Sequence, residues 1–336
     1  MTGREQSESS VSLVREPSAS LEPESSAPLS VESTPLVLEA GPSRLTLEPN
    51  YGGMINELIV PTPQGPRNVI AGVERCECAA NPGYRGAVLF PFPNRLRGGR
   101  YHFGGKELSF AVNEPALNNA LHGFLHRTPA EVVNQTASGD ISSATLVYAV
   151  DGTEPGYPFK AEVRMVYQLS AAGALQVEMQ VENKDTQPIP VGLGWHPYYT
   201  LGVSIDDCSL QLPAVERVLV DERMLPTGKR LVDERFNAPA GLAGVELDNC
   251  FVLGPKATEA AALFASEREG FGLQLWQQTG PRGLNFIQVY TSPDRQSLAV
   301  EPMSCGIDAF NTGEGLVVVK PGQSYKGVFG VRVCEA

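Results

Sequence analysis

The feature of this sequence that most restricts its fold is a strict alternation of apolar and polar residues in the middle of the chain. From Phe159 to Leu169 the odd positions are Phe, Ala, Val, Met, Tyr and Leu, and all but one of the even positions are polar or charged. After a turn at 171–173, the same alternation runs from Leu175 to Glu182. Because successive side chains of a strand point to opposite faces, these segments predict an antiparallel hairpin with one buried face and one face in water.

Further β-like runs occur on both sides of this hairpin, and Gly or Pro separates most of them. They lie at 144–150, 271–276, 284–290, 315–319 and 327–333. Helical periodicity is nearly absent, and 257–266 is the best short helix candidate. Many strands with few helices predict an all-β fold, a large antiparallel β-sandwich or a related architecture.

Composition narrows the classes of function. The 336 residues carry a formal net charge of -12, which disfavours nucleic acid and anionic membrane surfaces as partners. No apolar run approaches the ~20 residues that span a bilayer, and the first residues lack a secretory signal. Six scattered cysteines indicate free thiols in a reducing compartment, so we expect a cytoplasmic protein.

The first 34 residues differ from the rest of the chain. Ser, Glu and Pro dominate residues 1–34, and no aromatic residue precedes Tyr51. Such a stretch buries too little apolar surface to offset its ordering entropy, so we expect a disordered tail followed by one domain, residues 35–336.

Several motifs with a defined chemistry are missing: the phosphate-binding loop, the Gly-x-Gly-x-x-Gly turn of dinucleotide-binding folds and the Gly-x-Ser-x-Gly elbow of serine hydrolases. His122 and His126 have the spacing of a helical metal pair. Gly123 between them disfavours a helix, and the glutamate of a His-Glu-x-x-His zinc site is absent. The sequence therefore gives little support for a metal.

Two other residues have both a structural and a functional interpretation. His196, in Trp195-His196-Pro197-Tyr198-Tyr199, is either a packed core histidine or part of an aromatic sugar platform. Glu301 closes an apolar run before Pro302, a strand breaker, and at a sheet rim it is either a general base or a solvated charge.

An arginine cluster allows the same two interpretations. Arg95, Arg97 and Arg100 form a solvated turn or supply hydrogen-bond donors to sugar hydroxyls or a phosphate.

Taken together and in this order, short segments across the chain resemble the aldose 1-epimerase (galactose mutarotase) family. The resemblance extends from about residue 36 to the C-terminus. The matching segments, in chain order, are 52–55, Asn94-Arg95 with the following Gly-Arg-Tyr-x-Phe-x-Gly, Leu121-His122-Gly123, His196-Pro197-Tyr198-Tyr199, 247–251 and Val300-Glu301-Pro302. The His-Pro-Tyr segment departs from the Asn-His-x-x-Phe of the best-studied branch. This departure leaves the identity of the sugar open.

The resemblance implies a β-supersandwich with an open cleft for a monosaccharide, and a mutarotase without metal or organic cofactor. Glu301 would take the proton of the C1 hydroxyl, and His196, near an ordinary pKa of ~6.5, would protonate the ring oxygen. The other cleft residues would polarise or hold the sugar: His122, Arg95, Asp248, Asn94 and Tyr198. We expect a monomer or a weak dimer.

Three other functions remain open at this stage. A sugar-binding module would keep the cleft without catalysis. A hexose-phosphate epimerase would use Arg97 or Arg100 against the phosphate. A polysaccharide hydrolase or lyase would pair Glu301 with Asp248 across the bond, although two histidine segments fit ring opening better.

Overall fold

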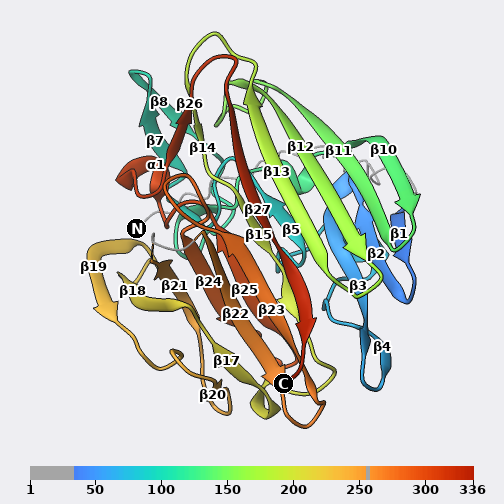
Figure 1. Ribbon diagram of the computed structural model, residues 1–336. Helices are drawn as coiled ribbons and strands as arrows, with labels where there is room; N and C mark the ends of the chain where they lie inside the picture. Colours follow the sequence, from blue (N-terminus) through green and yellow to red (C-terminus); the bar gives the residue numbers. More distant parts are fainter. Residues whose placement is uncertain (1–33, 255–257) are drawn as a thin grey trace, which may run out of the picture. The chain divides into compact units, whose positions relative to one another are not determined.

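The alternating segments build the largest sheet of the computed structural model, which describes residues 34–254 and 258–336. This nine-stranded antiparallel sheet is the broad front layer in Figure 1. In spatial order its strands are β10 (Glu131–Ser138), β11 (Ile141–Asp151), β12 (Lys160–Ser170), β13 (Leu175–Asn183), β27 (Ser324–Cys334), β23 (Phe271–Gln278), β22 (Glu259–Ser266), β17 (Ser209–Gln211) and β20 (Ala240–Gly241). The expected tail, residues 1–34, lies outside the described residues apart from Thr34.

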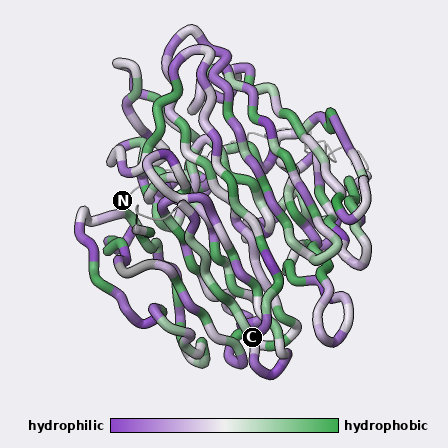
Figure 2. Tube along the Cα trace, viewed as in Figure 1, coloured by the Kyte–Doolittle hydropathy of each residue, from purple (hydrophilic) through white to green (hydrophobic). Residues whose placement is uncertain are grey.

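The predicted hairpin is confirmed as β12 and β13. Leu169 pairs with Leu175 across the turn, and Ala161 pairs with Asn183 at the far end. The odd residues from Phe159 to Leu169 are all buried. Figure 2 shows the resulting alternation of hydrophilic and hydrophobic residues along these strands.

A second antiparallel sheet, with eight strands, packs against the same hydrophobic core. Its strands are β19 (Pro226–Val232), β18 (Ala214–Val220), β21 (Asp248–Leu253), β24 (Phe286–Thr291), β25 (Leu298–Met303), β15 (Gly194–His196) and β5 (Ala87–Leu89), with β16 (Tyr198–Tyr199) also paired to β25. The central strands β25, β15 and β16 are buried along their whole length. This sheet therefore has no face open to water at its centre.

Smaller elements complete the described part of the chain. A four-stranded sheet contains β1 (Leu36–Ala40), β2 (Ser43–Glu48), β3 (Met54–Thr62) and β4 (Gly65–Asn68). Three strand pairs are β6 (Arg95–Arg97) with β9 (Asn119–Leu121), β7 (Arg100–Phe103) with β8 (Lys106–Ser109), and β14 (Ile189–Val191) with β26 (Val317–Val319). The described helices are short: η1 (Pro49–Tyr51), η2 (Arg75–Glu77), η3 (Leu125–Arg127), η4 (Ile205–Asp207) and α1 (Ala309–Thr312).

The all-β prediction is confirmed, and the single helix prediction is wrong. The candidate at 257–266 is the strand β22 from Glu259 onward, hydrogen-bonded to β17 and β23. Its alanines favour a helix locally, but pairing on both sides and burial of Ala262 and Phe264 in the core outweigh that preference. The other expected runs all contain strands, namely β11, β23, β24, β26 and β27.

Candidate active site

The floor of the candidate site is the outward face of the eight-stranded sheet. Along β15, Trp195 points into the core, where it stacks on Phe329 of β27 at 5.5 Å between ring centroids, and His196 points the other way. Along β24, Val289 belongs to the core, whereas Gln288 points outward. The period of two therefore places polar side chains from neighbouring strands on one surface.

Glu301 belongs to this floor rather than to a sheet rim. It lies inside β25, opposite Gln288 of β24, and only 2% of its surface is exposed. The prediction that Pro302 ends the strand is wrong, because β25 continues to Met303. Pro302 is tolerated there because β15 and β16 pair only with the ends of β25, so no partner on that side requires its missing N–H.

The walls come from the short pair β6 and β9. Asn94 precedes β6 and His122 follows β9, and the two residues bind each other reciprocally. The backbone N–H of His122 donates to the carbonyl of Asn94 at 3.0 Å, and the N–H of Asn94 donates to Nδ1 of His122 at 3.1 Å. Burial lowers the pKa of His122 well below its usual value. The ring is therefore neutral with its proton on Nε2, which leaves Nε2 as a hydrogen-bond donor.

Three of the seven left-handed non-glycine residues in the described part of the chain line the candidate site. Tyr84, Asn94 and His122 all have left-handed φ angles, of 54°, 60° and 64°. Gly123 is also left-handed, and a Cβ there would meet the carbonyl oxygen of Phe90 at 2.1 Å. Left-handed non-glycine residues are costly, and their clustering is typical of functional sites.

Floor and walls enclose a cavity of about 290 Å³. Its lining contains all seven residues named from the sequence: Asn94, Arg95, His122, His196, Tyr198, Asp248 and Glu301. Tyr84, Gln288 and Tyr290 also line the cavity, and sequence reasoning missed them. The signal for Gln288 was present as a polar residue in an otherwise apolar strand. Among the described residues, no group of three or more His, Cys, Asp or Glu side chains is arranged to hold a metal.

At the centre of the floor, His196 and Glu301 form a buried pair. Nε2 of His196 lies 3.4 Å from Oε1 of Glu301. Burial lowers the pKa of His196 to about 3, so the expectation of an ordinary histidine pKa is wrong. Burial, followed by the charge of Asp248, raises the pKa of Glu301 well above its usual value. The pair therefore holds one proton, and it resides on Glu301.

A chain of hydrogen bonds joins the remaining polar residues. The amide of Asn94 donates to Oε1 of Gln288 at 3.1 Å, and Nε2 of Gln288 donates to Oδ1 of Asp248 at 2.5 Å. Oδ2 of Asp248 lies 3.8 Å from Nη2 of Arg95. Burial raises the pKa of Asp248, and Arg95 acts in the opposite direction. These contacts fix the orientation of the groups that surround the empty space.

Aromatic rings frame the histidines. The Tyr198 ring stacks on His196 at 5.1 Å, and the guanidinium of Arg85 lies 4.4 Å from the centroid of Tyr198. Tyr84 approaches the ring of His122 to 4.6 Å. Such faces are suited to the apolar C–H surfaces of a small polar ligand.

Arg97 and Arg100 lie elsewhere. They line a different hollow, together with Arg223, and Arg97 binds Asp308 at 3.3 Å. The arginine cluster of the sequence is thus divided, and only Arg95 belongs to the cavity. Among the described helices none is long and apolar enough to cross a bilayer.

Comparison with known proteins gives a consistent result. The family model for aldose 1-epimerase matches residues 38–332. The Escherichia coli K12 protein YihR is 33% identical over 255 residues, which cover 73% of this chain and 78% of that protein. Galactose mutarotase of Mus musculus is 32% identical over 150 residues, 43% of this chain and 42% of that protein. The structure of a GalM/aldose epimerase homologue from Caenorhabditis elegans superposes with a TM-score of 0.78 at 21% identity, covering 90% of this chain and 100% of that chain.

Proposed function

Because the chain belongs to the aldose 1-epimerase family, we propose that it is a mutarotase that interconverts the α and β anomers of a free aldohexose. The observation that carries the proposal is the buried pair of Glu301 and His196 on the floor of a cavity. Mutarotation requires one proton to leave the C1 hydroxyl and one to reach the ring oxygen. A pair that holds a single proton meets that requirement without a metal or organic cofactor.

The proposed reaction begins when the C1 hydroxyl binds at Glu301. The stored proton passes across the 3.4 Å gap to His196, and Glu301 becomes the base. Glu301 then removes the C1 hydroxyl proton while His196 protonates the ring oxygen, and the C1–O5 bond opens. The carbonyl rotates, the ring closes on its other face, and both proton transfers reverse.

Surrounding residues orient the sugar in this proposal. The Nε2 proton of His122 is available to an oxygen at C1 or in the ring, since Nδ1 already accepts from Asn94. Arg95, Asp248 and Asn94 hold hydroxyls that do not react, and Tyr198 offers its ring. A cavity of about 290 Å³ suits one monosaccharide. We propose a cytoplasmic protein that acts as a monomer or weak dimer.

Anomer exchange over a panel of sugars tests the proposal. Freshly dissolved α-glucose, α-galactose and other aldoses are followed by polarimetry, and exchange NMR of the anomeric protons identifies the preferred sugar. We expect acceleration of at least one free aldose over the buffer rate. Acceleration of glucose 6-phosphate alone would instead support a sugar-phosphate epimerase. Sugar binding without acceleration would support a binding module, and release of reducing ends from oligosaccharides a hydrolase.

A further inference from the structure

Arg95 lies between two carboxylates at the edge of the cavity. Its Nε and Nη2 bind Glu114 in a bidentate manner, with distances from 2.9 to 3.2 Å. Its Nη2 lies 3.8 Å from Asp248, beyond hydrogen-bond distance. The guanidinium is therefore committed to Glu114 and only adjacent to Asp248.

This spacing needs an explanation, because opposite charges this close attract each other. Gln288 binds Oδ1 of Asp248, but Oδ2 is the oxygen nearest to Arg95, and an arginine free to approach a carboxylate oxygen closes to about 2.8 Å. A closed pair of Arg95 and Asp248 would direct their polar atoms at each other rather than at a ligand. Glu114 is absent from the lining of the cavity, so it binds Arg95 without taking space that a ligand would use.

Glu114 is itself held in place by Asn119. The amide of Asn119, in β9, donates to Oε2 of Glu114 at 2.9 Å and to the carbonyl of Arg223 at 3.0 Å. Asn119 is fully buried, and the backbone N–H of Glu114 donates to its carbonyl at 3.0 Å. The carboxylate thus has a fixed position and a fixed orientation.

We propose that Glu114 is a positioning residue that holds Arg95 away from Asp248, so that both side chains stay available to the hydroxyls of the sugar. This inference rests on the proposed function and extends it to a residue outside the cavity. The sugar then meets a donor and an acceptor side by side, one cationic and one anionic. Two neighbouring hydroxyls of a pyranose, one accepting and one donating, match such a pair.

The position of Arg95 is tested first, by the crystal structure of Glu114→Ala. We expect the gap between Arg95 and Asp248 to close from 3.8 Å to hydrogen-bond distance, about 3 Å. If Arg95 keeps its position or turns into solvent, the proposal is wrong. This readout needs no activity, so it separates failure of the inference from failure of the proposed function.

Sugar affinity is tested next, on a sugar that the wild-type protein accelerates or binds. Glu114→Ala should raise KM, or Kd for a sugar that is only bound, about tenfold at nearly constant kcat. Glu114→Gln, which keeps an oxygen acceptor for Arg95, should recover part of this loss. In an Asp248→Ala background, Glu114→Ala should add little, because Arg95 then has no carboxylate on which to close. A full and independent loss in that background would contradict the proposal.

A matched control separates positioning from stability. Glu269 binds Arg67 at 2.6 Å, and its side chain is 12% exposed, close to the 16% of Glu114. That ion pair lies outside the cavity lining. Glu269→Ala should therefore leave KM unchanged. An equal rise in KM in both variants would reduce the role of Glu114 to general stability and would overturn the inference.

Discussion

The two large sheets of this protein use the same strand geometry for different purposes. In the nine-stranded sheet, β12 alternates between buried and exposed residues, and the exposed face carries charges. In the eight-stranded sheet, β25 is buried at every position, and Glu301 interrupts an otherwise apolar strand. The difference shows that the face of β25 that lines the cavity is covered by other parts of the chain. A polar residue on a covered face is costly unless it has a partner, which makes it informative.

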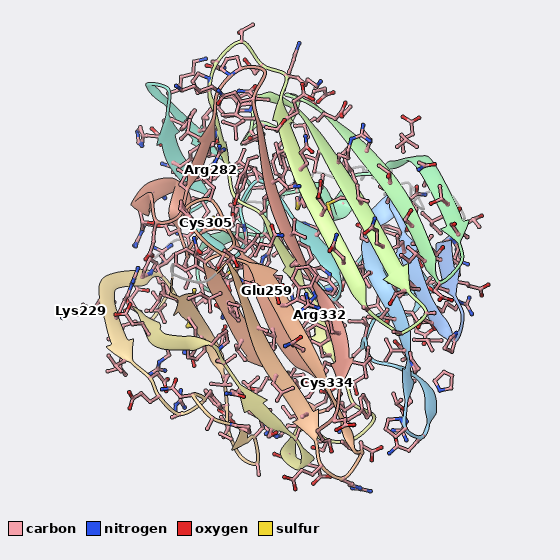
Figure 3. The ribbon with its side chains drawn as sticks, in the orientation of Figure 1. Lys229, Glu259, Arg282, Cys305, Arg332 and Cys334 are labelled. Atoms are coloured by element: carbon pink, nitrogen blue, oxygen red, sulfur yellow. The ribbon has the colours of Figure 1, made fainter. Side chains whose placement is uncertain are left out.

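Pairs of ionisable side chains on the two sheets differ in the same way. Arg332 of β27 and Glu259 of β22, labelled in Figure 3, bind at 2.8 Å with about 40% of each side chain exposed, on the outer face of the nine-stranded sheet. His196 and Glu301 are 9% and 2% exposed. Solvent screens the exposed pair of Arg332 and Glu259. In the cavity, burial lowers the pKa of His196 and raises the pKa of Glu301, because it disfavours the charged form of each group.

The largest effect is expected from a substitution that breaks the buried pair of His196 and Glu301. Glu301→Gln keeps the shape of the side chain but removes the proton acceptor, so kcat should fall by roughly 10²-fold or more. The matched substitution Glu259→Gln on the outer face should leave kcat unchanged and cost less than about 1 kcal/mol of stability. Polarimetry of a sugar whose anomer exchange the protein accelerates measures the kcat of both variants, and urea unfolding measures the stability of Glu259→Gln. Near wild-type turnover of Glu301→Gln would refute the mechanism.

A second substitution tests whether the nine-stranded sheet contributes to stability rather than to turnover. Leu169 of β12 is fully buried, and Leu169→Ala should lower the free energy of unfolding by about 2–5 kcal/mol because it removes apolar contacts and leaves a cavity. Urea unfolding measures this loss. The folded fraction should keep its kcat, because Leu169 belongs to the other large sheet and does not line the cavity. A loss of kcat without loss of stability would link this sheet directly to the chemistry.

A smaller effect is expected where residues hold the sugar without reacting. Asp248→Ala and Arg95→Ala should each raise KM by about tenfold with little change in kcat, as for binding that is equal in the ground and transition states. Initial rates over a range of sugar concentrations separate the two constants. If kcat falls while KM stays constant, the residue takes part in the chemical step.

The smallest effect is expected from pH. His196 has a pKa lowered to about 3, and Glu301 has a raised pKa, so the pair holds one proton over the range between them. The rate should fall on the acid side only when the pair gains a second proton, and on the alkaline side when it loses its only one. We expect the acid limb of the pH–rate profile near pH 3, and the alkaline limb above the usual range of a glutamate, because the pKa of Glu301 is raised. An acid limb near 6.5, the ordinary pKa of histidine, would contradict the buried pair.

The difference between the two large sheets also explains which parts of the fold and of the candidate site could be predicted from the sequence. The β12–β13 hairpin was predictable because one of its faces meets water and the alternation is visible. The strands β15, β16 and β25 gave no such signal, since both of their faces are covered. The seven named cavity residues came from a resemblance to a family, not from periodicity.

Other features depend on tertiary contacts that no local pattern contains. Glu114 reaches Arg95 across a loop, and Gln288 reaches Asn94 from a strand 194 positions away. The pKa of His196 depends on burial, which the aromatic residues around it in the sequence indicated but did not quantify. The strand β22 had a composition that favours a helix, and only its neighbours in the sheet decided otherwise.

The left-handed backbone at Tyr84, Asn94 and His122 has a consequence for how the protein can be improved. Each of these residues costs on the order of 1 kcal/mol relative to glycine at the same φ. Glycine would add an entropy cost of similar size through the unfolded chain, and at Asn94 and His122 it would delete buried hydrogen bonds. The same exchange would delete a ring or an amide from the cavity. These three positions therefore offer little for stabilisation, whereas changes in the outer face of the nine-stranded sheet leave the cavity untouched.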